Sequence, residues 1–107
     1  MNRLAAAAAM SLAFAAFAAD EPEFRLVIEN HKFTPEKVEV PAGKKVKLVI
    51  ENRDSTPEEF ESSSLKREKL IPGKSTGTVF IGPLKPGEYK FVGEFNEKTA
   101  KGVVVAK

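Results

Sequence analysis

Three glutamates surround one phenylalanine in the stretch TPEEFES, and they form the densest acidic group in the chain. Glu58, Glu59 and Glu61 offer oxygen ligands, which hard cations such as calcium or iron prefer. The alternative is a solvated turn, because runs of charge usually face water and the glutamates could be neutralised by nearby Lys66, Arg67 and Lys69. The residue types leave a metal site and an acidic turn both open.

His31 is the single histidine of the chain, and cysteine is absent. An imidazole beside carboxylates can bind Cu(II) or iron without sulfur, but a lone histidine is also an ordinary solvated turn residue. One imidazole without a nucleophile-elbow motif gives little support to hydrolase chemistry. The lack of cysteine excludes thiolates as nucleophiles and as metal ligands. We therefore do not expect an enzyme that acts on an organic substrate.

Alternating apolar residues predict that β-strands position these side chains. Phe24, Leu26 and Ile28 alternate with residues on the other face, as in a half-buried strand. Alternation, or enrichment in β-branched and aromatic residues, marks further strands at residues 38–40, 46–50, 76–82, 87–95 and 102–107. Glycine and proline turn signals separate them. We therefore expect an all-β protein, a small Greek-key sandwich or barrel of about seven strands.

The segment 55–74 lacks a strand period. Serine, proline and charged residues dominate it, and four of its residues are expected to be buried: Phe60, Leu65, Leu70 and Ile71. A helical turn could begin at Pro57, since Ser55 or Thr56 could cap it. We therefore predict a long crossing connection here.

Residues 1–18 have the layout of a secretory signal peptide, with a charged start at Arg3, an apolar stretch at 4–17 and small residues before the cleavage point. Ala16 and Ala18 supply the two small positions, so we expect cleavage after Ala18. The apolar stretch is shorter than the roughly 20 residues of a spanning helix and is mostly alanine. We therefore expect a periplasmic protein without direct membrane insertion after cleavage.

The remaining residues, 19–107, are enough for one domain. Their basic and acidic residues nearly balance, which gives no sign of nucleic-acid binding. Without cysteine, the domain cannot use disulfides, so its stability must come from packing or from a bound ligand.

Four motifs, in order along this domain, resemble the cupredoxin family. The stretch HKFTPEKVEVPAGKKVKLVIENRD resembles the opening strands of that family, and TPEEF stands where the first ligand histidine would follow its proline. LKPGEYKFVGEF resembles the approach to the ligand cysteine, and AKGVVVAK resembles the glycine and closing strand beyond the ligand loop. The resemblance implies a cupredoxin-like fold.

The resemblance also implies which residues stand at the copper ligands. Glu58 takes the place of the first histidine, Gly93 that of the cysteine and Asn96 that of the second histidine, with Ala100 or Lys101 at the axial methionine. A blue copper centre needs two histidines and a cysteine, so this chain cannot build one. Its oxygen donors favour harder ions, which implies iron or Cu(II) as the cofactor.

The same resemblance places His31 on a loop at the metal end of the barrel, facing Glu58. We therefore predict one metal site shared by His31 and Glu58. Glu94, Glu59 and Asn96 are the further candidates to complete it. Glu94 is the substitute for the missing ligand at Asn96, although strand alternation from Tyr89, Phe91 and Gly93 would point it away from the core side.

Within the family, the chain resembles cysteine-free members such as those accompanying bacterial periplasmic iron-uptake permeases. This implies a metal-binding protein that assists iron or copper uptake or oxidation, with an iron permease or a periplasmic redox protein as its partner. A histidine is expected at Asn96 in such proteins, so this chain lacks a nitrogen ligand. The alternative is a metal-free interaction module whose acidic end docks a transporter or a redox partner.

Overall fold

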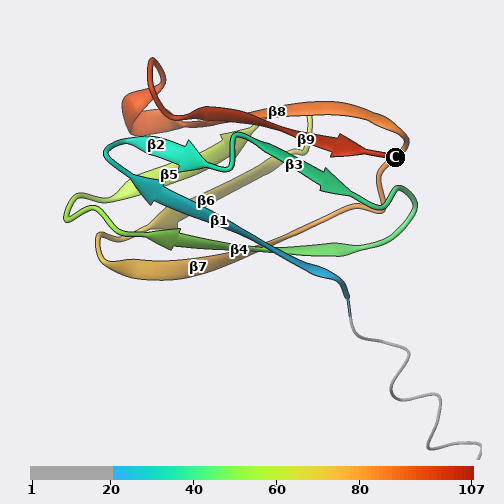
Figure 1. The fold of residues 1–107 in the computed structure, drawn as a ribbon, viewed down its shortest axis with the longest axis horizontal. Helices are drawn as coiled ribbons and strands as arrows, with labels where there is room; N and C mark the ends of the chain where they lie inside the picture. The colour runs from blue at the N-terminus through green and yellow to red at the C-terminus, as the bar shows by residue number, and fades with distance from the viewer. Residues whose placement is uncertain (1–20) are drawn as a thin grey trace, which may run out of the picture.

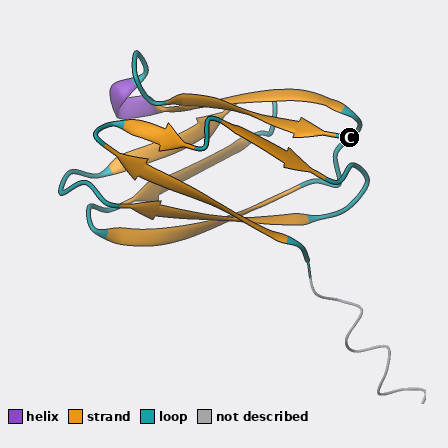
Figure 2. Cartoon of the chain, viewed as in Figure 1, coloured by secondary structure: helices purple, strands orange, loops and turns teal. Residues whose placement is uncertain are grey.

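The computed structural model describes residues 21–107, so the predicted signal peptide at 1–18 and its cleavage position lie outside the described residues. The described elements are β1 (Glu23–Glu29), β2 (Lys32–Thr34), β3 (Lys37–Val40), β4 (Val46–Asn52), β5 (Glu58–Ser62), β6 (Arg67–Ile71), β7 (Ser75–Ile81), β8 (Gly87–Gly93), the short 3-10 helix η1 (Glu94–Asn96) and β9 (Lys101–Ala106). Figure 2 shows the predominance of strands. An all-β fold is thus confirmed. Between residues 21 and 107, no helix has the length and apolar character needed to span a membrane.

The strands form two sheets that face each other (Figure 1). The four-stranded sheet has the order β2-β1-β4-β7, and the five-stranded sheet has the order β3-β9-β8-β5-β6. Most neighbours are antiparallel, but β1 runs parallel to β4 and β3 runs parallel to β9. These parallel pairs arise because the chain crosses between the two sheets, with β2 and β4 in one sheet and β3 in the other.

The core lies between the sheets and follows the alternation of the sequence. Every second residue of β4 faces inward, and Leu48 and Ile50 are fully buried. Phe33, Phe60 and Phe91 form an aromatic cluster that joins β2 to β5 and β8, with ring centroids 4.9 to 6.3 Å apart. Phe33 meets the other two rings edge to face, and such contacts add to the hydrophobic stabilisation of the core.

The segment 55–74 is where the sequence-based prediction is wrong. It forms the β5–β6 hairpin instead of a crossing connection with a helical turn. The inward positions of β5 include the polar residues Glu58 and Ser62, which hide the period of two from a hydrophobicity pattern. β6 lies at the edge of its sheet, so Leu70 is 54% exposed, contrary to expectation, although Phe60, Leu65 and Ile71 are buried as expected.

Strand direction brings four connections to one end of the sandwich, on the left in Figure 1. These are the β1–β2 turn, the β4–β5 connection, the β6–β7 turn and the loop that contains η1. We call this end the loop end. It carries all five residues that the sequence proposed as metal ligands: His31, Glu58, Glu59, Glu94 and Asn96.

Candidate functional site

Glu58 is a buried acidic residue at the start of β5, with only 2% of its surface exposed. Its Oε1 accepts hydrogen bonds from the backbone N–H groups of Glu59 and Phe95, both at 2.9 Å. Its Oε2 accepts a 2.8 Å hydrogen bond from the side-chain amide of Asn96. Because a buried charge needs partners, these three donors explain how a carboxylate is accommodated here.

Gly93 and Ala100 line the space beside this carboxylate. The N–H of Gly93, the last residue of β8, donates to the carbonyl of Ala100 at 2.8 Å. A Cβ at Gly93 would lie 2.7 Å from Oε2 of Glu58 and 2.8 Å from the Cβ of Ala100. Ala100 is fully buried whereas Lys101 is exposed. Glu58, Gly93 and Asn96, which the resemblance matched to three copper ligands, therefore lie close together, with buried Ala100 beside them.

The residues at this point do not fit a blue copper ion. The chain has no thiolate to offer, and a hydrogen bond joins Glu58 to Asn96, the residues at the two histidine places. Three hydrogen bonds already use three of the roughly four acceptor sites of the Glu58 carboxylate, so at most one site, on Oε2, is left for a metal ion. The geometry is that of a polar linkage between β5 and the η1 loop.

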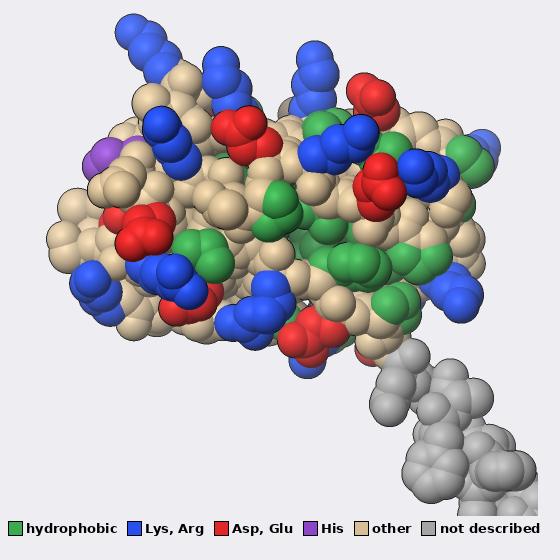
Figure 3. Space-filling view, viewed as in Figure 1, with side chains coloured by type: hydrophobic (Ala, Val, Ile, Leu, Met, Phe, Trp, Pro, Cys, Tyr) green, Lys and Arg blue, Asp and Glu red, His purple; other side chains and the backbone are tan. Residues whose placement is uncertain are grey.

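His31 lies in the β1–β2 turn and pairs with Asp54. Asn30 and His31 both have positive φ angles, 55° and 57°, and their N–H groups donate to the two carboxylate oxygens of Asp54 at 2.8 and 3.0 Å. The Nδ1 atom of His31 lies 3.5 Å from Oδ2 of Asp54. Figure 3 shows the imidazole at the surface of the loop end. Asp54 therefore holds both the backbone and the ring of this turn.

Partial burial alone would raise the pKa of the Asp54 carboxyl. The N–H groups of His31 and Asn30 outweigh that effect, together with the charges of His31 and Lys74, so the pKa is lowered from its ordinary value. The Asp54 carboxyl therefore stays ionised to a lower pH than an ordinary aspartate does.

The structure brings four of the five proposed ligands into one neighbourhood: Glu58, Glu59, Glu94 and Asn96. Among residues 21–107, the polar contacts of His31 are with Asp54, and none joins it to Glu58. A metal site shared by His31 and Glu58 stays a prediction.

A second group of carboxylates lies on the surface next to Glu58. One oxygen each of Glu59, Glu68 and Glu94 can be chosen so that all three lie within 4.8 Å of one another. We call these three residues the carboxylate cluster. The sequence does not point to Glu68, because only the register of the β5–β6 hairpin brings this residue of β6 beside β5. Recognising that hairpin would have paired Glu61 with Glu68 and pointed to it.

Neighbouring carboxyl groups raise the pKa values of Glu59, in the carboxylate cluster, and of adjacent Glu61. A hydrogen bond with the Glu94 carboxyl, followed by partial burial and the charges of Glu94, Glu68 and Glu61, raises the pKa of Glu59. The charge of Glu94, with smaller effects of burial, Glu68 and Glu97, raises the pKa of Glu61. A cation bound between the carboxylates would relieve this repulsion.

The nearby basic side chains do not neutralise the cluster. Among the described residues, no ion pair involves Glu59, Glu68 or Glu94. Arg67 instead donates to the carbonyl oxygens of Phe80 and Lys66, at 2.8 and 2.9 Å. The hypothesis that Lys66, Arg67 and Lys69 neutralise this acidic segment therefore finds no support in the ion pairs.

Comparison with solved structures supports the fold. A copper-binding protein studied by NMR in its apo form matches with a TM-score of 0.70 and 20% identity, over 79% of this chain and 86% of that one. Auracyanin A, a blue copper protein of Chloroflexus aurantiacus, matches with a TM-score of 0.70 and 12% identity, over 82% of this chain and 100% of its own. At such low identity these similarities establish the shared fold alone.

Sequence comparison finds a relative in Rickettsia prowazekii (strain Madrid E), an uncharacterised protein. The two are 43% identical over 83 residues, which cover 78% of this chain and 66% of the relative. This chain therefore spans slightly less than two thirds of that protein. The family model of the cupredoxin-like domain matches residues 2–106. Fold, motif order and this match agree, and the chain belongs to the cupredoxin-like domain family.

Proposed function

We propose that this protein binds Cu(II) or iron through the carboxylate cluster and serves as a periplasmic accessory to metal uptake, next to an iron permease. The observation that carries the proposal is the approach of the Glu59, Glu68 and Glu94 oxygens to within 4.8 Å of one another without a basic partner among the described residues. Oxygens bound to one ion at about 2.0–2.6 Å lie at comparable separations.

The chemistry of the donors limits the kind of ion. Carboxylate oxygens favour hard or borderline cations, whereas Cu(I) prefers sulfur ligands. Such a site would hold Cu(II) or iron by charge and would supply no thiolate for fast electron transfer. The role that follows is to hold an ion at the surface, where a partner could receive it.

The structural relatives give this proposal its context. Proteins with this fold include a copper-binding protein and a blue copper protein. Because fold does not fix function, metal binding by this chain rests on its own carboxylates and not on those relatives. The periplasmic location and the permease partner come from the signal-peptide layout and the resemblance to permease-associated cupredoxins.

Exposed apolar residues favour a second candidate function, the docking of a partner without metal. Phe95 in η1 is 53% exposed and Leu70, which is paired with Glu59 in the hairpin, is 54% exposed. Large apolar side chains next to unpaired carboxylates fit a partner surface with both apolar and basic residues. On this hypothesis the carboxylates attract the partner and not an ion.

Isothermal titration of the protein with Cu(II), Fe(II) and Fe(III) distinguishes the two functions. Glu59→Gln and Glu94→Gln should each weaken binding roughly tenfold or more, because each removes a charged ligand. Glu97→Gln makes the same charge change in the same loop outside the carboxylate cluster, so it should bind like the wild type. Binding that is lost in His31→Ala but kept in Glu94→Gln would place the ion at His31 instead. An absence of binding to all three ions would leave the docking function.

A further inference from the structure

β8 is paired along most of its length on one side only. Its ladder with β9 runs from Gly87 to Val92, whereas its ladder with β5 consists of two pairs, Phe60 with Gly93 and Glu61 with Val92. No other strand of the described chain pairs with β8. The stretch from Gly87 to Lys90 is therefore an open edge in the interior of the five-stranded sheet.

Backbone alternation shows which groups face this open edge. The N–H of Gly93 donates to Ala100, on the side of β9. Backbone groups of successive residues in a strand point to opposite sides, so Glu88 and Lys90 face away from β9. The Ser62 hydroxyl donates to the carbonyl of Lys90 at 2.6 Å. The N–H of Lys90 and both backbone groups of Glu88 are left without a ladder partner in the described chain.

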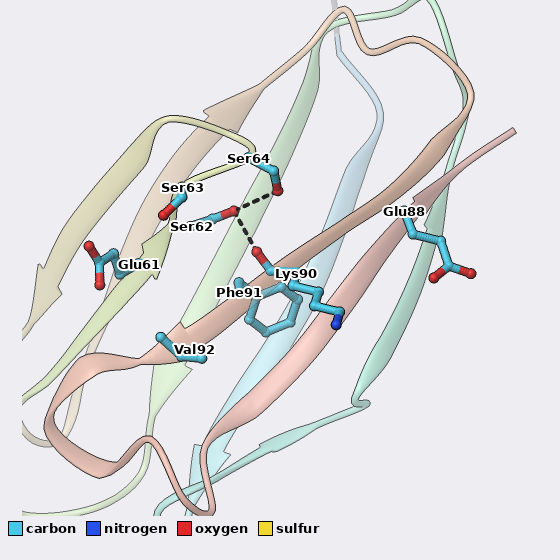
Figure 4. A pocket seen from close by; sticks show the side chains of 8 residues that line it. All are labelled: Glu61, Ser62, Ser63, Ser64, Glu88, Lys90, Phe91 and Val92. Carbon is cyan, nitrogen blue, oxygen red and sulfur yellow. Dashed lines mark hydrogen bonds between the residues drawn. The ribbon is translucent and has the colours of Figure 1, made fainter.

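A cavity of about 420 Å³ lies along this edge. Figure 4 shows its lining, with Ser62 bonded to the Lys90 carbonyl and Ser64 on one side, and Glu88 further along β8. Its lining residues are Glu61, Ser62, Ser63, Ser64, Glu88, Lys90, Phe91 and Val92. The Ser62 hydroxyl also accepts the N–H of Leu65 at 3.1 Å, which holds the hairpin turn beside the cavity.

We propose that this open edge binds a short extended segment of a partner protein, which adds a strand to the five-stranded sheet between β8 and the β5–β6 turn. The free groups are two donors and one acceptor at residues two apart in β8, which is the spacing that another strand satisfies. Strand addition takes its affinity mainly from backbone hydrogen bonds, and the cavity, whose lining surface is mostly apolar, fits apolar side chains of the segment.

The edge site is independent of the proposed metal function. It uses backbone groups of Glu88 and Lys90, whereas the carboxylate cluster uses the side chains of Glu59, Glu68 and Glu94. Loss of one activity would therefore leave the other unchanged.

The test begins with a display library of random peptides of about eight residues, long enough to span the edge at about 3.3 Å per residue. Selected peptides are then bound to the isotope-labelled protein, and amide hydrogen exchange is followed by NMR. In the free protein, the amides of Tyr89 and Phe91 should exchange slowly and those of Glu88 and Lys90 quickly. Bound peptide should slow exchange at Glu88 and Lys90.

Glu88→Pro provides the matched variant, because it removes an edge N–H and leaves the hydrogen bonds to β9 in place. It should weaken peptide binding at least about tenfold, whereas Glu88→Ala, which keeps the N–H, should bind normally. A second measurement covers the case in which the proline variant does not fold. Selected peptides are methylated at one backbone nitrogen at a time and tested with the wild-type protein. Methylation should abolish binding at every second residue of the peptide only, because only those N–H groups face β8.

Four outcomes would overturn the proposal. These are a selection that yields no binding peptide, equal binding to Glu88→Pro and wild type, exchange protection elsewhere than at Glu88 and Lys90, and N-methylation effects without alternation. A concentration-dependent dimer that Glu88→Pro abolishes would show that the edge is occupied by a second copy of this chain, and would overturn the assignment to another protein.

Discussion

The side-chain amide of Asn96 donates a 2.8 Å hydrogen bond to the buried carboxylate of Glu58, which lies 38 positions away in the chain. By resemblance to cupredoxins, these residues stand at the two places that histidines hold around copper. Here a direct bond between two side chains links the same two segments, β5 and the η1 loop. This hydrogen bond takes over the geometric role that a metal plays in joining them.

Asn96→Ala should destabilise the protein by about 1.5–3 kcal/mol, the range for losing a hydrogen bond to a charged group. The loss leaves Oε2 of Glu58 without its donor in a buried setting. Urea unfolding measures the change in the free energy of unfolding. Lys98→Ala, at an exposed position of the same loop, is the control and should change stability little. Equal stability of Asn96→Ala and wild type would show that the hydrogen bond contributes nothing.

Gly93→Ala should destabilise the fold by about 1–3 kcal/mol, as overpacking of a filled interior does. The new methyl group would lie 2.6 Å from Cδ of Glu58 and 2.8 Å from the Cβ of Ala100. Gly77→Ala is the matched control in another strand, because its methyl group would meet only side-chain carbons of Ile71 and Lys69, at 3.1 and 3.5 Å. Thermal unfolding of both variants should rank Gly93→Ala as the more damaging, and the reverse order would contradict the packing described here.

Glu94→Gln should raise the melting temperature at neutral pH. The hydrogen bond and charge of Glu94 contribute to the raised pKa of Glu59, so the folded protein holds protons more tightly there than the unfolded chain does. A raised carboxyl pKa means that stability is highest below the ordinary value of 4.5 and is lost as pH rises through the folded pKa. The increase in melting temperature caused by Glu94→Gln should therefore vanish near pH 4. An increase that persists in acid would show that it does not come from repulsion between Glu94 and Glu59.

Metal binding to the carboxylate cluster should weaken as pH falls towards 4.5, because ligand carboxylates must be ionised. The raised pKa of Glu59 means that the loss begins above that value. Titrations with Cu(II) from pH 7 to pH 4 check this prediction. Affinity that does not change over this range would exclude carboxylates as the principal ligands.

Asp54→Ala should destabilise the β1–β2 turn by about 1–3 kcal/mol, since both N–H groups of Asn30 and His31 lose their acceptor. The pKa of Asp54 is lowered, so its contribution is present above the ordinary value of 3.8 and is lost as pH falls through the folded pKa. Comparison of Asp54→Asn with wild type across this range by urea unfolding should show a flatter pH dependence in the variant. Parallel curves would mean that the carboxylate charge does not stabilise the turn.

Hydrophobic alternation was enough to predict strands such as β1 and β4, because one face of each meets the core. It failed at β5, where Glu58 and Ser62 occupy inward positions and depend on hydrogen bonds that no pattern of hydrophobicity records. It failed also at β6, an edge strand in which only Ile71 is buried. A strand is missed by hydrophobic alternation when polar residues face the core, as in β5, or when apolar residues face water, as in β6.

The candidate site shows the same division. Motif order placed Glu58, Gly93 and Asn96 around one point, and the structure brings them there. The sequence does not show whether Glu58 and Asn96 bind an ion or each other. That depends on the conformation of the η1 loop, which points the Phe95 N–H and the Asn96 amide at the Glu58 carboxylate. The position of Glu68 beside β5 likewise depends on the hairpin register, which the local sequence pattern does not predict.

The position of β9 has a consequence for how the protein acquires its structure. This strand lies in the five-stranded sheet between β3 and β8, and it supplies buried Val104 and Ala106 to the core. Its partners in β3 are separated from it by most of the chain, so a large loop must close before the sheet is continuous. A nascent chain that has not yet extended to Ala106 cannot complete its core, so the five-stranded sheet can close only after synthesis has passed that residue.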